Sequence, residues 1–491
     1  MKRRTFCASA FSMLATASMP WSRALATPGS IPALGPDGQH VMLTSADLAD
    51  LRGRFKGTLL LRGQDGYDAA RRIWNGAFDR KPALIALCAG AKDVATAVEF
   101  ARAHDLLVAV RGGGHSLSGQ SVCEGGLMID LSRMKGVQVD VARKRARVLP
   151  GTLLGQFDRE SQAHGLATTA GTVSHTGVAG LTLGGGFGRI GRKYGLACDN
   201  LIGAEVVTAD GRRITASTTE NEDLLWGLRG GGGNFGVVTT FEYQLHDVNP
   251  MMHGGPLVFP LVKARELLRA YAEISSEASD DLYIDAMIVP TPDGQRALAL
   301  DVCHIGPPAA VERDFAQLRK IGTPVQDGLR AAKYVDLQCS ADANYPAGRK
   351  YYIKSGFVQT LDARTTDAVI DYLESAPMPS GVMGFVHHGG AISRVKPTAT
   401  AFWHRDASHS VMVIGFWDDP AATAENARWV RNGWRAVEPL TDGFYVNEIA
   451  ADDDQRRVRA TYGDNYKRLV SLKKKFDPTN LFRMNANITP A

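Results

Sequence analysis

The sequence has few cysteines, no long apolar run and little net charge, and each shortage excludes a class of protein. Six cysteines occur in 491 residues, none at the C-x-x-C spacing of a zinc site, so no bound metal is expected. No apolar run after the first 26 residues approaches the ~18 needed to span a membrane. The hydrophobic content of 44% is nevertheless typical of a globular chain with a large core.

The formal net charge is close to zero once residues 1–26 are set aside. The formal net charge is +5, and Lys2, Arg3, Arg4 and Arg23 carry four of these charges, which leaves +1. A near-neutral chain lacks the broad basic surface that nucleic acid or an anionic membrane requires. Neither is therefore expected as a partner.

Residues 1–26 have the pattern of an export signal. A basic start is followed by a mildly apolar stretch and a small-x-small ending at Ala24 and Ala26. The Arg3-Arg4 pair before Thr5 and Phe6 resembles a twin-arginine signal, and an ordinary secretory signal is the alternative. We expect an exported, periplasmic or secreted protein that engages the twin-arginine machinery. Removal of the signal leaves five cysteines, so at least one thiol is free or pairs with another chain.

Glycine is abundant, with 52 residues, and it is clustered in loops at 111–115, 177–191, 195 and 229–236. Two of these loops contain G-x-G-x-x-G, at 186–191 and 231–236, the motif of nicotinamide-binding Rossmann domains. That motif has to open a long helix, but the segment "RKYGLACDN" after Gly191 shows little helical periodicity. A better interpretation is that several glycine loops converge on one large anionic cofactor, which backbone N–H groups can hold. FAD fits this description.

The order of predicted elements indicates an α+β fold. Residues 79–110 are predicted as strand, helix and strand, followed by a strand at 125–134, hairpins at 137–151 and 204–217, a helix at 152–165 and a strand at 237–245. After residue 249, long antiparallel strands at 281–306, 381–395 and 409–417 alternate with amphipathic helices at 309–322, 365–377 and 421–437. A last helix at 465–477 stops before Pro478.

Four segments together carry a family resemblance: "VRGGGHSLSG", "VSHTGVAGLTLGGGFGRIGRKYGLACDNLIGAEVVTADG", "LRGGGGNFGVV" and "YGDNYKRLVSLKKKFDPTNLFRMNANITP". In this order they resemble the berberine-bridge-enzyme-like FAD-linked oxidases of the vanillyl-alcohol-oxidase, or PCMH-type, fold. The resemblance implies a two-lobed protein: an FAD-binding domain at 78–248, a substrate domain with an antiparallel sheet backed by helices at 249–440, and a C-terminal segment at 441–491 that returns to the FAD lobe.

The resemblance also implies which residues hold the cofactor. His115 matches the histidine that such enzymes bond to the flavin 8α-methyl carbon, and a neutral imidazole is a competent nucleophile. The full predicted cofactor set is His115, Arg111, Gly112, Gly113, Gly114, Ser116, Thr172, Val173, Thr176, Gly177, Gly180, Leu181, Gly236, Val238, Asn485 and Asn487. Many relatives carry a second, cysteine attachment where this chain has Val173, so FAD is expected to be attached only through His115.

Two further departures concern the chemistry. Thr176 matches a position that affects oxygen access in relatives, and it is neither of the residues associated there with access or blockage. Phe187 replaces a tyrosine that acts as a base in some relatives. The remaining base is predicted to be Tyr445, with Asn447 two residues later on the same face of a strand. A phenol must have its pKa lowered from ~10 to act as a base.

In the substrate domain, His387 and His388 are candidate substrate contacts, and His404 and Arg405 are further candidates with a structural role as the alternative. Only one of two adjacent strand histidines can face the flavin. The expected activity is oxidation of an alcohol, sugar or amine by hydride transfer to FAD, with dioxygen as the electron acceptor. A dehydrogenase with another acceptor, or a non-catalytic flavin-binding envelope protein, is the alternative.

Overall fold

The computed structural model describes residues 29–376 and 381–490. The export signal predicted for residues 1–26 lies outside the described residues and stays a prediction. Within the described ranges, no helix combines the length and apolar character required to cross a membrane.

The strand–helix–strand pattern predicted at 79–110 supplies an inner strand, β4, and an edge strand, β5, to a four-stranded sheet of order β3-β4-β6-β5. Its strands are β3 (Thr58–Leu61), β4 (Leu84–Leu87), β5 (Val108–Arg111) and β6 (Leu127–Asp130), and β4, β6 and β5 are parallel. The apolar side of α3 (Ala91–Ala103) packs on this sheet. Because β5 ends at Arg111, the first glycine loop leaves the carboxyl end of a parallel strand, where α/β units commonly bind ligands.

A second, antiparallel sheet follows in the order β11-β10-β12-β8-β7. Both predicted hairpins are confirmed, and the turn at Asp210-Gly211 gives Gly211 a φ of +84°. The elements are β7 (Val137–Asp140), β8 (Arg145–Val148), α4 (Leu154–Gln162), β10 (Leu201–Val207), β11 (Arg213–Ser217), α7 (Glu222–Leu228) and β12 (Val237–Gln244). Between them, α5 (Val178–Leu183) and α6 (Gly191–Tyr194) are short. The four residues of α6 cannot form the crossover helix of a dinucleotide-binding unit.

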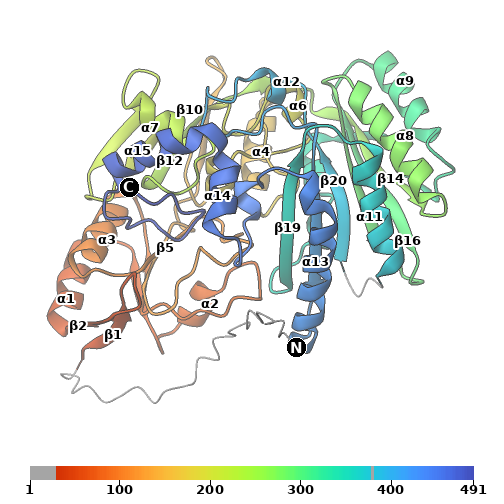
Figure 1. Cartoon of the computed structure of the whole chain (residues 1–491). Helices are drawn as coiled ribbons and strands as arrows, with labels where there is room; N and C mark the ends of the chain where they lie inside the picture. Colours follow the sequence, from red (N-terminus) through yellow and green to blue (C-terminus); the bar gives the residue numbers. More distant parts are fainter. Residues whose placement is uncertain (1–28, 377–380, 491) are drawn as a thin grey trace, which may run out of the picture.

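The middle of the chain forms an eight-stranded antiparallel sheet, in which β18 pairs with β14 outside the path β17-β14-β16-β15-β20-β21-β19. Its elements are β14 (Met251–Pro260), α8 (Ala264–Glu277), β15 (Leu282–Pro290), β16 (Arg296–His304), α9 (Pro308–Arg319), β17 (Gln326–Asp327), β18 (Arg330–Lys333), β19 (Lys350–Val358), α11 (Ala363–Ser375), β20 (Gly381–His387), β21 (His409–Trp417) and α13 (Thr423–Val437). Figure 1 shows α8, α9, α11 and α13 along one side of this sheet.

Alternation along β21 divides the sheet into two faces. Val411 and Val413 belong to the core beneath the helices, whereas Met412 and Ile414 belong to a cluster on the opposite face that also contains Leu117. Leu117 comes from the loop after β5, so this second face of the sheet lies against the first glycine loop.

The C-terminal helices α14 (Gln455–Tyr462) and α15 (Tyr466–Phe476), blue in Figure 1, return to the first lobe. Their apolar residues share one core with β8, β10, β12 and α7. At the end of α15, Lys473 donates to Asp477 at 2.6 Å and to the carbonyls of Asn234 and Phe482. Since both charged side chains are fully buried, this pair fixes the course of the last residues.

The remaining elements are short: β1 (Ile31–Leu34), β2 (His40–Leu43), α1 (Ser45–Arg54), α2 (Tyr67–Arg71), β9 (Leu166–Ala167), β13 (His246–Asp247), α10 (Tyr334–Cys339) and α12 (Ala391–Arg394), with 3-10 turns that include η4 (Val446–Glu448). The strand predicted around Tyr445 is therefore wrong. Tyr445 caps η4, in a segment where Gly443 has a φ of +54°, which a continuous strand does not allow.

Candidate active site

Two glycine segments lie against each other at the centre of the site. A Cβ atom on Gly113 would lie 2.5 Å from the backbone nitrogen of Gly177, closer than any side chain tolerates. Gly177 precedes α5, and Gly113 follows β5, so this approach joins two segments that are 64 residues apart in the sequence. Glycine is required at both positions because backbone packs on backbone.

His115 follows directly in this loop and is held by two ring contacts. Its imidazole stacks on Trp74 with ring centroids 4.2 Å apart, and its Nε2 atom lies 2.9 Å from Nδ1 of His175. Burial, and then the neighbouring His175, lower the pKa of His115 to about 3. The imidazole is therefore neutral at physiological pH, as a nitrogen nucleophile must be.

A cavity of about 350 Å³ opens beside this loop. Its walls come from the loop after β5, from Thr176–Leu183, from Gly232–Val238, from Tyr445–Ile449 and from Phe482–Ala486. No lysine or arginine belongs to the described lining, as expected for a cofactor held largely by backbone groups. Ser118, Ser121 and Asn485 each line the cavity with a buried oxygen that lacks a hydrogen-bond partner among the described residues. These unpartnered atoms and the glycine walls fit a long, polar cofactor such as FAD.

The predicted cofactor residues divide into three groups. The larger cavity is lined by Gly112, Gly113, His115, Ser116, Thr176, Gly177, Gly180, Leu181, Gly236, Val238 and Asn485, together with the predicted catalytic pair Tyr445 and Asn447. Thr172 and Val173 line a second, smaller cavity instead. Arg111, Gly114 and Asn487 line neither: the Arg111 guanidinium is turned toward buried Asp130 at 3.6 Å, and the Gly114 carbonyl accepts a hydrogen bond from Trp74.

The smaller cavity has a volume of about 240 Å³ and lies between the glycine segments and the large sheet. Both cavities share the lining residues His115, Leu117, Thr176, Leu181, Tyr445 and Glu448. The rest of the wall of the smaller cavity is mostly aromatic or apolar and includes Trp74, Phe187, Tyr283, Tyr345, Tyr351, Ile353 and Met412. A molecule in the smaller cavity therefore lies next to whatever fills the larger one.

Tyr445 lies where the two cavities meet. Its phenolic oxygen accepts hydrogen bonds from the Gly186 backbone at 2.9 Å and from Nδ2 of Asn447 at 2.7 Å. Burial raises the pKa of Tyr445 well above its usual value, although both donors act in the opposite direction. The hydroxyl is therefore a neutral donor at physiological pH, which opposes its predicted role as a base.

The histidines predicted as substrate contacts line neither cavity. Nε2 of His387 bonds the Ser275 carbonyl at 3.0 Å, and its backbone N–H donates to Asp285. His388 stacks on Phe187 at 4.1 Å and bonds Ser410 at 3.1 Å. Both histidines contact residues that do line the smaller cavity, namely Phe187, Asp285 and Ser410, and their own role as substrate contacts stays a prediction.

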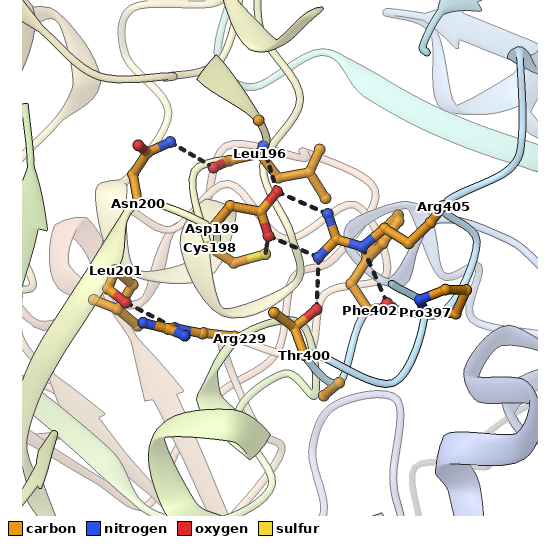
Figure 2. Close-up of polar contacts among 12 residues, drawn as sticks. Leu196, Cys198, Asp199, Asn200, Leu201, Arg229, Pro397, Thr400, Phe402 and Arg405 are labelled. Atoms are coloured by element: carbon orange, nitrogen blue, oxygen red, sulfur yellow. Dashed lines mark hydrogen bonds and ion pairs between the residues drawn. The ribbon is translucent and has the colours of Figure 1, made fainter. Parts of the chain in front are cut away.

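Arg405 and His404 are structural. Figure 2 shows the Arg405 guanidinium directed at Asp199, which it binds through two hydrogen bonds of 2.7 Å. Asp199 also accepts from the Leu196 backbone at 2.8 Å. The His404 ring is buried and stacks on Phe357 at 4.5 Å. The bidentate pair thus ties the segment after α6 to the loop before β21.

Sequence reasoning missed three residues of the site: Trp74, His175 and Glu448. Trp74 precedes the recognisable glycine motifs, and only tertiary packing brings it to His115. His175 lies inside "VSHTGVAG" and Glu448 directly follows Asn447, so both adjoin residues that were identified. The only sequence signal that could have identified His175 and Glu448 was their position next to a predicted site residue. The described residues contain no cluster of three potential metal ligands, and none of the described cysteines lines either cavity.

Comparison with known families gives two matches along the chain. The family described as "FAD binding domain" matches residues 82–217. The family described as "Berberine and berberine like" matches residues 444–489. Both matched regions contribute walls to the larger cavity.

Similar proteins extend this likeness over most of the chain. An FAD-linked oxidoreductase of Dictyostelium discoideum is 31% identical over 439 residues, which covers 89% of this chain and 95% of that protein. The (R)-6-hydroxynicotine oxidase of Paenarthrobacter nicotinovorans is 32% identical over 450 residues, covering 89% of this chain and 97% of the oxidase. The crystal structure of 6-hydroxy-D-nicotine oxidase from Arthrobacter nicotinovorans superposes with a TM-score of 0.83 at 31% identity, covering 89% of this chain and 98% of that one.

Proposed function

Because the chain belongs to the berberine-like family of FAD-linked oxidoreductases, we propose that it oxidises a small molecule bound in the smaller cavity, with FAD bound in the larger one. The observation that carries this proposal is the shared wall of the two cavities. FAD, when bound, supplies a two-electron acceptor for a hydride from the substrate. The protein residues orient the substrate and exclude water.

The attachment of the flavin is part of the proposal. His115 lines both cavities and is neutral, and its imidazole is oriented by Trp74 and His175. Val173 stands where a cysteine would supply a second bond, and no described cysteine lines the larger cavity. We therefore assign a single covalent bond, through His115.

The experiment that tests this assignment follows the yellow colour after acid precipitation. In the wild-type protein, flavin should stay with the pellet, and in the His115→Ala variant it should move to the supernatant. His246→Ala is the matched control, because His246 is a half-buried histidine that lies outside both cavities. Flavin released from wild-type protein would contradict the covalent bond, and a protein that cannot be loaded with FAD would contradict the proposed function itself.

Dioxygen is the proposed electron acceptor, as it is in a flavoprotein oxidase. Thr176, whose position bears on oxygen access in relatives, lines both cavities and therefore lies where dioxygen would meet the flavin. Stopped-flow mixing of reduced protein with air-saturated buffer distinguishes dioxygen from other electron acceptors. Reoxidation within seconds supports an oxidase, whereas reoxidation only by an added quinone or dye supports a dehydrogenase.

The proposal that the protein is exported rests on the sequence of residues 1–26 alone. The twin-arginine pattern suits a protein that folds and takes up its cofactor before translocation. Fractionation of producing cells, with the flavin fluorescence of each fraction measured, tests this part of the proposal.

A further inference from the structure

The smaller cavity contains two carboxyl groups and no fixed positive charge in its described lining. Asp285 and Glu448 both belong to the wall, and the only lining residue that could become cationic is His115, which burial keeps neutral. Of the two lysines on β19, Lys354 is already paired with Asp452 and Asp453, and Lys350 donates to the Asp418 carbonyl. Outside the wall, the Arg189 guanidinium acts on Asp285 and is itself paired with Asp301 at 2.7 Å. Within the described lining, the charge of a bound cation would therefore be the only one to offset these carboxyl groups.

The two carboxyl groups differ in how they are held. Asp285 accepts hydrogen bonds at both oxygens, from the Tyr283 hydroxyl and from the His387 backbone at 2.8 Å. Glu448 has a buried Oε2 atom with no hydrogen-bond partner among the described residues. A buried, unpartnered carboxyl oxygen costs free energy unless a ligand satisfies it. Glu448 is thus the group that is free to bind and to exchange a proton.

Glu448 also has the right location. It lines both cavities, so a substrate that touches it lies beside the larger cavity as well. The turn η4 positions it, because Asn447 in the same turn is fixed by hydrogen bonds to the Leu181 carbonyl and the Tyr445 hydroxyl. Burial raises the pKa of Glu448 to about 7, so the group can gain and lose a proton near neutral pH. The Ser355 hydroxyl lies close enough to act in the opposite direction on this pKa, but its oxygen makes no hydrogen bond to Glu448 among the described residues.

The rest of the wall suits a cation with an apolar body. Trp74 is itself stacked between the rings of His115 and Tyr351, at 4.2 and 4.0 Å. Tyr283, Tyr345, Tyr351 and Phe187 complete an aromatic lining. Aromatic faces attract an ammonium group through their quadrupole, and they bury its alkyl or aryl substituents. A sugar would instead need several polar partners for its hydroxyl groups.

We propose that the substrate is a small amine bound as its ammonium ion, and that Oε2 of Glu448 accepts the proton that leaves the nitrogen. This inference rests on the proposed function. The N–H bond breaks and its proton moves to Glu448. The hydrogen on the adjacent carbon leaves with its electron pair to the flavin, the nitrogen lone pair forms the C=N bond, and the product is an iminium ion. Atoms and charge balance, and the flavin electrons pass to dioxygen.

The pH dependence of binding follows from the charge on Glu448. The other titratable groups around the cavity are His115, Tyr283, Asp285, Tyr345, Tyr351 and Tyr445. Burial favours the neutral form of each at neutral pH, although Asp285, whose pKa is also raised to about 7, titrates alongside Glu448. Because a raised carboxyl pKa leaves the group protonated below about 7, cation binding should strengthen as pH rises through 7 and then level off.

Binding of two matched probes to the oxidised, flavin-loaded protein tests the proposal. Phenyltrimethylammonium and its neutral carbon analogue tert-butylbenzene have the same shape, and neither has an N–H or O–H group to lose. Isothermal titration and the perturbation of flavin absorbance report their affinities. The wild-type protein should prefer the cation on the order of tenfold above pH 7. Glu448→Gln should lose most of this preference and most of its rise through pH 7, with unchanged affinity for tert-butylbenzene.

Two comparisons make the result specific. Glu277→Gln removes one negative charge from an exposed position of α8 and should behave as wild type. The rate at which an amine reduces the flavin should no longer increase with pH near 7 in Glu448→Gln, but it should still do so in Tyr445→Phe. The reverse result would assign the base to Tyr445.

Equal affinity of the wild-type protein for both probes would overturn the proposal, and this readout does not depend on the folding of any variant. Flavin that is reduced by alcohols or sugars but by no amine would overturn the substrate class and leave the proposed function standing. A wild-type protein without FAD would overturn the proposed function instead.

Discussion

At the scale of single residues, the chemistry of the site depends on how His115 is oriented. One face of its ring is covered by Trp74, and its Nε2 atom is engaged by His175. If Nε2 carries the proton and donates it to His175, the lone pair is on Nδ1, which becomes the attacking atom. In the proposed attachment, His175 would accept the Nε2 proton once Nδ1 had formed its bond to the flavin. We therefore regard His175 as a positioning residue for flavin attachment.

Replacing His175 should slow the attachment of flavin. His175→Leu removes the acceptor and leaves a buried ring nitrogen unpaired, at a cost of about 1–3 kcal/mol. His175→Asn keeps an acceptor oxygen near the position of Nδ1 and should rescue the reaction. The measurement is the fraction of flavin retained after acid precipitation, followed over time as apoprotein is loaded with FAD. Equal rates for the two variants would contradict a hydrogen-bonding role.

At the scale of elements, the site depends on short segments with little regular structure. The loop after β5, the start of α5 and the turn η4 all meet at the border of the two cavities. These segments can approach so closely because glycines face one another, as Gly113 and Gly177 do. In the same way, a Cβ atom on Gly184 would collide with the Asn447 side chain, so the glycine run at 184–186 makes room for η4.

Gly177→Ala should therefore damage both stability and cofactor binding. Its φ of −80° suits any residue, so the defect is purely one of space. The added methyl would push the two loops apart, at a cost of at least about 1–3 kcal/mol. Gly53→Ala is the control, because a Cβ atom there meets nothing within 4 Å in an exposed helix. Thermal melting and FAD content measure the difference, and equal values for the two variants would contradict the close packing.

At the scale of the whole molecule, the cavities exist because two lobes are held together at defined contacts. Asn75 bonds the backbone of Tyr351 in both directions, at 2.9 and 3.0 Å, and also the carbonyl of Leu117. The Arg405–Asp199 pair makes a second link, between the segment after α6 and the loop before β21 (Figure 2). Its guanidinium is buried, with a side-chain exposure of 1%.

Arg405→Met should destabilise the protein strongly. It leaves the Asp199 carboxylate in the interior without its partner, and loss of one member of a buried pair costs about 3–5 kcal/mol. Arg394→Met, which breaks an exposed pair with Asp280, should leave the unfolding midpoint unchanged. Urea unfolding followed by tryptophan fluorescence compares the two. A midpoint for Arg405→Met within error of wild type would show that the link carries no stability.

Local signals in the sequence were sufficient for many elements. The 3.6-residue periodicity of 91–105 predicted α3, and alternation with Asp210-Gly211 at the turn predicted the β10–β11 hairpin, because both patterns depend only on neighbouring residues. The long strands β14 and β19 were missed for different reasons. In β14, Gly254, Gly255 and Pro256 interrupt the sequence pattern of a strand, whereas most of β19 is buried on both faces and does not alternate clearly. Tyr445 and Asn447 were identified as site residues, but they were expected in a strand, whereas they lie at the 3-10 turn η4.

The sequence by itself determined the family, the α+β fold class, the glycine loops and His115, because these are carried by residue order and by motifs whose spacing is local. Only the tertiary structure decided which residues share a cavity. It brought Trp74 and His175 to His115 and placed His387 and His388 behind the wall. It also left Oε2 of Glu448, between the two cavities, without a hydrogen-bond partner in the described part of the chain. Such contacts join segments far apart in the chain, and they follow from how the lobes pack.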